Sequence, residues 1–441
     1  MDRKDLDRLK DLAEGFRTGR LSVMDYLDRI KTRFDKIEPQ VKAFVSEETD
    51  RFERLAQEIK DLESRFPDPD SRPALYGIPV GVKDIFHVEG FPTRAGSRVP
   101  SRVLGGPEAT SVMILKSAGA LVLGKTVTTE FAYFAPGPTR NPHNMGHTPG
   151  GSSMGSAAAV ATGLCPLALG TQTVGSVLRP ASFCGVVGFK PSYGRISVDG
   201  VIPLALSVDH VGFFTADVDG AAIVASVLCE GWRQIAELSR PVFGVPEGPY
   251  LKKASEEGLG HFGQTCSRLS EAGFQIRPVD MFKDFEDIFQ RHNTLVAAEA
   301  AQVHQEWFGT YSGLYHEKTA ELIRRGQGVG PDVLEACRAG REKLRGEIMS
   351  CMDQYGLSAF LAPTAVGSAP PGLEITGDPV MNLPWTHAGL PAMSLPSGKN
   401  AEGLPLGLQL IGRWMGDEEL LGLAREIVST TGDWGRAMLS K

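Results

Sequence analysis

Apolar residues recur at helical spacing over the first 65 residues of the chain. One face of the first predicted helix carries four of them, Leu6, Leu9, Leu12 and Phe16. Ser22 is a suitable N-cap for a second helix, whose apolar face carries Tyr26, Leu27, Ile30 and Phe34. We therefore expect residues 1–70 to form an N-terminal helical layer that packs on the rest of the chain.

After a proline-rich connector, short apolar strands alternate with helices. The first strand, over residues 77–83, ends at Lys83. The pattern continues with further elements, a helix at 109–118, a strand at 120–123, a helix near 153–162 and a strand at 185–188. Strand signals return at 359–362, 392–395 and 404–411, where the turn at 400–403 indicates a closing hairpin. This alternation predicts an α/β fold with a mainly parallel, helix-covered sheet.

Residues 255–355 are mostly helical by pattern and rich in charged residues. Five aromatic side chains lie in this region, Phe285, Phe289, Trp307, Tyr311 and Tyr315. They could line an aromatic-friendly pocket or pack inside the helices, and the core interpretation is favoured for each.

The composition is that of an ordinary soluble globular protein, with 42% hydrophobic residues, 22% charged residues and a formal net charge of −7. A modest, interspersed negative charge argues against a nucleic-acid or anionic-membrane partner. The six cysteines have no C-x-x-C spacing, and the charged N-terminus shows no export signal, so a cytoplasmic location is expected. Residues 141–178 contain no charged residue, but their many Gly, Ser, Thr and Pro indicate a buried protein core and exclude a membrane span.

Two segments match the sequence patterns of known functional motifs, but the secondary structure predicted around each segment does not suit the motif. Residues 119–126 satisfy the phosphate-loop pattern, yet the residues between its glycines are themselves a predicted strand. Residues 151–155 satisfy G-x-S-x-G, which would make Ser153 a nucleophile on a strand-to-helix elbow. The loop before Ser153 contains no strand, so this interpretation is also disfavoured.

The spacing of His143 and His147 would suit metal ligands on a helix. Three intervening or flanking residues exclude a regular helix there, Pro142, Gly146 and Pro149. We expect both histidines to hold backbone groups in a loop, and we expect neither a metal site nor a cofactor.

Two serine-bearing loops flank a predicted helix of small residues. Residues 150–156 open that helix, and residues 170–176 follow it and end at Ser176. Such loops can bring hydroxyl and backbone N–H groups into one concavity, which suits a nucleophile beside an oxyanion site. Neither loop contains a histidine, so the candidate base is Lys83, whose apolar setting would favour the neutral amine. Tight turns and a surface lysine would explain the same pattern without any chemistry.

From about Tyr76 to Gly200, and again from Asn382 to Gly412, the chain resembles the amidase signature family. The matching blocks are GIPVGVKD at residues 77–84, GGSS at 150–153, and Gly175-Ser176 followed by CGVVGFKP at 184–191. The details of these blocks most resemble the malonamidase-like members. The resemblance implies one α/β catalytic domain over residues 71–441, with a large mixed, mainly parallel sheet covered by helices on both faces. Residues 255–355 would then be a helical substrate-pocket region.

The same resemblance assigns roles to individual residues. It implies that Ser176 is the nucleophile, that Ser152 follows a cis peptide bond and shuttles the proton, and that Lys83 is the general base. The family's oxyanion hole corresponds to three backbone N–H groups, those of Thr173, Val174 and Gly175. Thr171 and Ser153 would support the site from behind.

Two positions depart from the pattern of many members. Val174 stands where glycine is common, so the oxyanion loop carries a branched side chain that should stiffen it. Arg179 is the only Asp, Glu, Lys or Arg between residues 141 and 189, and a lone buried guanidinium normally has a partner. That partner could be a substrate carboxylate, as the malonamidase resemblance implies, or an internal carboxylate in an ion pair, for which Asp209 is a candidate.

The function implied is an amidohydrolase acting on a small-molecule amide, with anilides, carbamates and esters accessible by the same acyl-enzyme route. The chain would act as a monomer or homodimer, without nucleic acid or membrane. The alternative is one component of a tRNA-dependent amidotransferase, which resembles the chain over the same blocks. Its Thr-Asp-Thr-Gly-Gly-Ser-Ile-Arg loop is replaced here at four positions, Gln172, Val174, Leu178 and Arg179.

Overall fold

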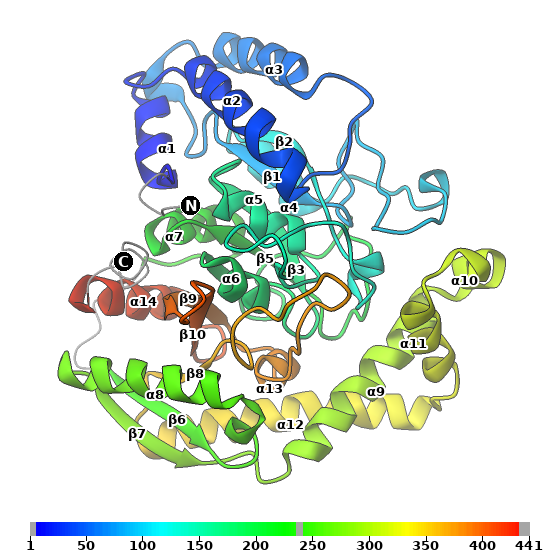
Figure 1. Cartoon of the computed structure of the whole chain (residues 1–441), viewed down its shortest axis with the longest axis vertical. Helices are drawn as coiled ribbons and strands as arrows, with labels where there is room; N and C mark the ends of the chain where they lie inside the picture. Colours follow the sequence, from blue (N-terminus) through cyan, green and yellow to red (C-terminus); the bar gives the residue numbers. More distant parts are fainter. Residues whose placement is uncertain (1–5, 235–240, 432–441) are drawn as a thin grey trace.

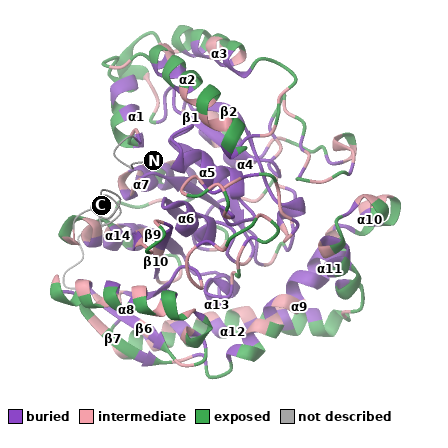
Figure 2. Cartoon of the chain, viewed as in Figure 1, coloured by how far each residue is buried: buried purple, intermediate pink, exposed green. Residues whose placement is uncertain are grey.

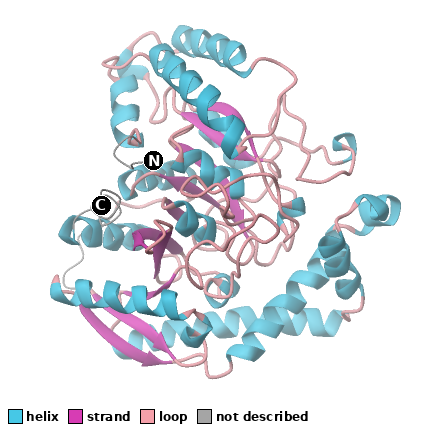
Figure 3. Cartoon of the chain, viewed as in Figure 1, coloured by secondary structure: helices cyan, strands magenta, loops and turns pink. Residues whose placement is uncertain are grey.

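The computed structural model describes residues 6–234 and 241–431 of the chain. Its centre is a 10-stranded sheet in the order β2-β1-β3-β5-β4-β9-β10-β8-β6-β7 (Figures 1 and 3). The strands are β1 (Pro79–Lys83), β2 (Leu121–Thr126), β3 (Leu167–Gln172), β4 (Val187–Lys190), β5 (His210–Thr215), β6 (Val242–Glu247), β7 (Gln275–Asp280), β8 (Ala359–Pro363), β9 (Ala392–Lys399) and β10 (Pro405–Ile411). The predicted α/β class with a large mixed sheet is confirmed.

Parallel pairing is confined to the two ends of this sheet. β1 pairs in parallel with β2 and β3, and β6 pairs in parallel with β7 and β8. Between these ends, the neighbours from β3 through β5, β4, β9 and β10 to β8 all pair antiparallel. The expected predominance of parallel strands therefore holds only at the ends, since neighbouring strands in the middle run in opposite directions, as in the β9–β10 hairpin.

Helices cover both faces of the sheet. The α-helices of the described residues are α1 (Leu9–Arg17), α2 (Val23–Val41), α3 (Arg51–Arg65), α4 (Thr110–Ser117), α5 (Met154–Ala161), α6 (Leu178–Cys184), α7 (Val218–Leu228), α8 (Glu256–Glu271), α9 (Phe285–Val303), α10 (Gln305–Tyr311), α11 (Glu317–Gln327), α12 (Pro331–Tyr355), α13 (Leu383–His387) and α14 (Asp417–Thr431). On one face, α5 and α6 lie side by side; on the other, α4, α7, α14 and α8 form a row in which each contacts the next. None of the described helices is long and apolar enough to cross a bilayer.

The N-terminal helices form as the apolar pattern predicts. The side chain of Ser22 accepts a hydrogen bond from the backbone N–H of Asp25 and so caps α2. Leu9, Leu12 and Phe16 of α1 are buried, as are the apolar residues predicted for the face of α2, except that Phe34 is only partly buried.

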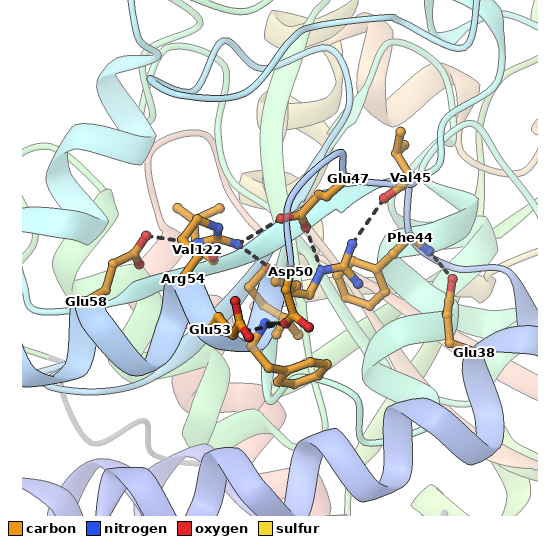
Figure 4. Close-up of polar contacts among 12 residues, drawn as sticks. Glu38, Phe44, Val45, Glu47, Asp50, Glu53, Arg54, Glu58 and Val122 are labelled. Atoms are coloured by element: carbon orange, nitrogen blue, oxygen red, sulfur yellow. Dashed lines mark hydrogen bonds and ion pairs between the residues drawn. The ribbon is translucent and has the colours of Figure 1, made fainter.

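α3 protects the free edge of the sheet. β2 is the end strand, so its outward-facing carbonyls need partners from outside the sheet. Arg54 donates hydrogen bonds to the carbonyls of Val122 and Leu123, at 3.0 and 3.2 Å, and Glu47 holds the same guanidinium at 3.2 Å (Figure 4). The N-terminal layer is thereby tied to the strand beside β1.

The region over residues 255–355 is helical as expected, with one exception. It contains β7, which pairs with β6 at the far edge of the sheet. The segment Gln-Ile-Arg-Pro-Val-Asp is short and mostly exposed, so it lacks the apolar run that indicates a buried strand. The sequence pattern, which predicts mostly helix here, did not single out this strand, whereas the predicted hairpin at residues 400–403 is confirmed by the antiparallel β9 and β10.

Every residue of α5, from Met154 to Ala161, is buried (Figure 2). Complete burial explains why the residues of α5 are uncharged and mostly small. A Cβ added at Gly155 would collide with the carbonyl oxygen of Ala43 and the backbone nitrogen of Val127. Close approach of three backbone segments therefore requires glycine at this position.

Replacing Gly155 by alanine should lower the free energy of unfolding by about 3 kcal/mol or more, because backbone cannot move aside as a side chain can. The matched control is Gly260→Ala in α8, where no atom lies within contact distance of the added methyl group. That change should stabilise the protein by up to about 1 kcal/mol through helix propensity. Urea unfolding of both variants checks the prediction, and equal effects would contradict the close packing around α5.

Candidate active site

Lys83 and the ends of the two serine loops meet at one edge of the sheet. β1 and β3 are parallel neighbours, with Val82 opposite Leu169. Parallel strands present their carboxyl ends at the same edge. Lys83 at the end of β1 and Thr171 near the end of β3 are therefore brought together although they lie 88 residues apart in sequence.

Lys83 is fully buried and is held by two hydroxyl groups. Its Nζ lies 2.7 Å from Ser152 Oγ and 2.7 Å from Thr171 Oγ1. Among the described residues no carboxylate forms an ion pair with it. Burial lowers the pKa of Lys83 well below its usual value, and the negative charge of Asp209 acts in the opposite direction without reversing the shift.

The peptide bond between Gly151 and Ser152 is cis. Its carbonyl group, on Gly151, accepts a hydrogen bond of 2.7 Å from Nη2 of Arg179. A Cβ at Gly151 would come within 2.8 Å of the side chain of Thr376. The loop that presents Ser152 is thus packed between α6, which carries Arg179, and the segment before α13.

Ser153 is occupied by backbone contacts. Its hydroxyl oxygen lies 3.2 Å from both the carbonyl oxygen and the backbone nitrogen of Thr171, and the side chain is completely buried. Ser153 thus ties the start of α5 to β3. This position agrees with the rejection of a G-x-S-x-G elbow and with a supporting place for Ser153.

Ser176 lines an enclosed cavity of about 140 Å³ together with Ser152, Thr173, Val174 and Arg179. The residue is 8% exposed, and within the described part of the chain no hydrogen bond engages its hydroxyl group. Its carbonyl oxygen accepts a weak hydrogen bond of 3.4 Å from the backbone N–H of Ser153. The two serine loops therefore touch directly, and both Ser152 and Ser176 face the same small space.

The backbone of the loop before Ser176 leaves N–H groups free. Among the described residues, none of the hydrogen bonds of this loop starts from the N–H groups of Thr173, Val174 or Gly175. Consecutive free N–H groups beside a cavity form a concave site for a negative oxygen. The side chain of Val174 lies on the cavity wall, so the branched residue narrows the chamber at this point.

Asp209 fixes the first residue of that loop. Its carboxylate accepts a hydrogen bond of 2.5 Å from Thr173 Oγ1 and two from the backbone N–H groups of Leu204 and Ala205, at 2.8 and 2.9 Å. Burial raises the pKa of Asp209 to about 6 in spite of these donors. Sequence reasoning considered Asp209 only as a partner for Arg179 and missed this role.

Arg179 does not pair with Asp209, so that expected alternative is wrong. The Asp209 carboxylate is occupied by Thr173 and by backbone N–H groups, and in the described residues Arg179 has no carboxylate within ion-pair distance. Besides its bond to Gly151, the guanidinium donates a hydrogen bond to the hydroxyl of Thr376, at 3.3 Å. Its Nε and Nη1 are buried and have no hydrogen-bond partner in the part of the chain that the structure describes. Burial lowers the pKa of Arg179 to about 10, against the opposing effect of Asp378.

A family model described as Amidase matches residues 25–421. The chain belongs to the amidase family. The resemblance to the amidase signature family is thereby confirmed.

Relatives and solved structures of this family align over nearly the whole chain. A glutamyl-tRNA(Gln) amidotransferase subunit from Synechococcus sp. (strain WH7803) is 32% identical over 92% of this chain and 94% of its own length. The corresponding subunit from Acinetobacter baumannii (strain AYE) is 30% identical over 98% and 97%.

Among solved structures, one described as a crystal structure of amidase has a TM-score of 0.86 and 32% identity, covering 95% of this chain and 98% of its own. The native peptide amidase from Stenotrophomonas maltophilia has a TM-score of 0.82 and 26% identity, covering 96% of each chain.

The outer walls of the cavity in this amidase come in part from helices within residues 255–355, where Phe289 was the one lining residue that the sequence analysis named. α9 contributes Phe289, Asn293 and Val296, and α11 contributes Leu322 and Arg325. These helices carry no motif, and only the tertiary arrangement brings them to Ser176. The small cavity shares six lining residues with a larger one of about 850 Å³, namely Tyr133, Phe134, Leu322, Arg325, Asp378 and Pro379. The larger cavity is therefore an entrance to the inner chamber.

The five aromatic residues and the two loop histidines singled out from the sequence lie mostly outside the cavity. All five aromatic residues from the helical region belong to or pack against the hydrophobic clusters, namely Phe285, Phe289, Trp307, Tyr311 and Tyr315. Phe289 also lines the cavity, so the core interpretation was incomplete for it. His143 contacts the carbonyl of Cys184 at 3.0 Å and His147 that of Ala369 at 2.8 Å, which confirms that both hold backbone groups.

Proposed function

We propose that this amidase hydrolyses acyl C–N bonds of small molecules through an acyl-enzyme formed on Ser176. The observation that carries the proposal is the contact of 2.7 Å between Lys83 and Ser152, in a site where burial favours the neutral amine. A neutral lysine can accept a proton near neutrality, whereas an ammonium group cannot.

In the proposed first step, Ser176 attacks the substrate carbonyl carbon while its hydroxyl proton passes through Ser152 to Lys83. The oxygen that becomes negative lies against the free N–H groups of the loop from Thr173 to Gly175. The proton then returns through Ser152 to the leaving nitrogen, and the amine departs. Water, activated by the same pair, attacks the ester carbonyl and releases the acid. Thr171 holds Lys83 in place throughout.

The acyl-enzyme route also admits anilides, carbamates and esters, because each has a carbonyl carbon that a serine can attack and a group that can leave. We further propose that the chain acts on its own, as a monomer or homodimer, in the cytoplasm. The size of the inner chamber, about 140 Å³, supports a short acyl group with the rest of the substrate in the entrance.

A second candidate function is that of a tRNA-dependent amidotransferase component. The relatives named above support it, since they are amidotransferase subunits at 30–32% identity. The loop before the nucleophile weighs against it, because Gln172 and Val174 replace the aspartate and glycine of the amidotransferase loop. An assay of the purified chain, with no partner present, separates the two candidates. The first candidate predicts that the chain releases amine from p-nitroanilides, primary amides or carbamates.

The Ser176→Ala variant should lose that amine release entirely, because it removes the attacking oxygen from a preformed loop. Its melting temperature should stay close to that of the wild type, since no hydrogen bond to this hydroxyl is lost. Ser153→Ala should lower stability and retain the nucleophile. It breaks two buried contacts and should cost about 1–3 kcal/mol of stability, but a serine-directed covalent reagent should still label Ser176. Labelling of Ser153 instead of Ser176 in the wild-type protein would overturn the assignment.

Arg179 offers a test of substrate charge. Its two unpartnered N–H groups could receive a substrate carboxylate, so Arg179→Ala should reduce kcat/KM for acidic amides roughly ten- to a hundredfold more than for neutral amides. Arg325→Ala, which removes the second guanidinium of the cavity, serves as the matched control. Equal losses on acidic and neutral amides would show that Arg179 serves only to hold the carbonyl of Gly151.

A further inference from the structure

α13 lies directly behind the loop that carries the free N–H groups. Thr386 of this helix places its Oγ1 at 2.7 Å from the carbonyl oxygen of Val174. The same Oγ1 lies 2.9 Å from Nε2 of Gln172, the last residue of β3. Thr386 and Gln172 are both completely buried, so these contacts have no competition from water.

The donors and acceptors of this network have only one consistent arrangement. Oε1 of Gln172 accepts hydrogen bonds from the backbone N–H groups of Val177 and Leu178, at 2.9 and 3.0 Å. This fixes the orientation of the amide, so its NH2 group faces Thr386 and donates to Oγ1. The single hydroxyl proton of Thr386 is then directed to a carbonyl oxygen, and Val174 at 2.7 Å is nearer than Asn382 at 3.0 Å.

The carbonyl of Val174 and the N–H of Gly175 belong to one planar peptide unit. In a trans peptide these two groups point in opposite directions. Because the carbonyl points to α13, the Gly175 N–H points away from α13. Asn382 lies one turn before Thr386, and its side chain is so close to Gly175 that a Cβ on Gly175 would collide with it. The loop therefore cannot move closer to α13.

We propose that Thr386 and Gln172 are positioning residues for acyl transfer at Ser176. The relay from the Gln172 amide through the Thr386 hydroxyl to the Val174 carbonyl fixes the plane of the 174–175 peptide. It thereby aims the Gly175 N–H at the oxygen that becomes negative. This inference rests on the proposed function, since that oxygen develops charge only when Ser176 attacks a carbonyl or a similar centre.

A carboxylate at position 172 would reverse the relay. Glutamate has the length of glutamine and can still accept from Val177 and Leu178, but it has no proton to donate to Thr386. The Thr386 hydroxyl would then donate to the carboxylate, and its only proton would leave the Val174 carbonyl. Gln172→Glu should therefore have the same effect as removing the Thr386 hydroxyl.

The experiment measures the rate at which an alkyl fluorophosphonate modifies Ser176, with the modified residue identified by mass spectrometry. In this reaction the serine oxygen bonds to phosphorus, fluoride leaves and the hydroxyl proton goes to the base, so no substrate need be known. Thr386→Val should slow the modification roughly ten- to a hundredfold, as expected when one oxyanion donor is misdirected. Thr386→Ser should restore most of the rate.

Two further readouts separate positioning from a general loss of structure. Gln172→Glu should be as slow as Thr386→Val, and the double variant should be no slower than either, because both changes break one relay. The pH dependence of the rate should stay the same in Thr386→Val and Thr386→Ser, since Lys83 is untouched and neither change adds a charge. The matched control is Thr265→Val in α8, which removes an equally buried threonine hydroxyl that donates to the carbonyl four residues earlier, and it should leave the rate unchanged.

Thr386→Val modified at the wild-type rate would overturn this inference while leaving the proposed function intact. A wild-type protein that is not modified at Ser176 would instead overturn the proposed function. If Thr386→Val does not fold, Gln172→Glu decides alone, because it retains the cap on Val177 and Leu178. A wild-type rate in Gln172→Glu then contradicts the relay.

Discussion

The arrangement of the site depends on the burial of Lys83 without a paired carboxylate. A buried ammonium group is costly unless a negative charge lies against it, and among the described residues the hydrogen-bond partners of Nζ are the hydroxyls of Ser152 and Thr171, each at 2.7 Å. The carboxylate of Asp209, whose charge opposes the effect of burial on Lys83, is engaged by Thr173 and two backbone N–H groups. The fold therefore favours the neutral amine, which is the form that can take a proton from a serine.

This constraint accounts for the unusual composition around the site. A charged side chain close to Lys83 would restore its proton or disturb the loops, and residues 141–178 contain none. Small residues in α5 allow the serine loops to approach the end of β1, and Gly155 allows that helix to touch two other backbone segments. Arg179, the charged residue that directly follows this stretch, is anchored on the carbonyl next to Ser152. Helix α13 supports the opposite side of the chamber through Thr386.

Features that depend on a short stretch of consecutive residues could be predicted from the sequence. The helix caps, the strand that ends at Lys83 and the rejection of the two misleading patterns follow from residues adjacent in the chain. The individual lining residues of the pocket wall could not be selected within residues 255–355, because Phe289 and Arg325 reach the cavity only through the packing of α9 and α11 on the core. The hydrogen bond from Thr173 to Asp209 could not be predicted either, since the position of an aspartate in the sequence does not show which donor or cation its carboxylate contacts. Thr386 carries no motif, and only its distance to Val174 reveals a role.

The pH dependence of kcat/KM for the wild type and for Lys83→Arg tests the central claim most directly. In the wild type, activity should rise with pH along one ionisation whose midpoint lies well below the usual pKa of lysine, because only the unprotonated amine accepts the serine proton. Lys83→Arg should lose several orders of magnitude at every pH, since a guanidinium does not give up its proton in this range. A Lys83→Arg enzyme with activity close to the wild type would contradict the account, because a permanently charged side chain could act only through its charge.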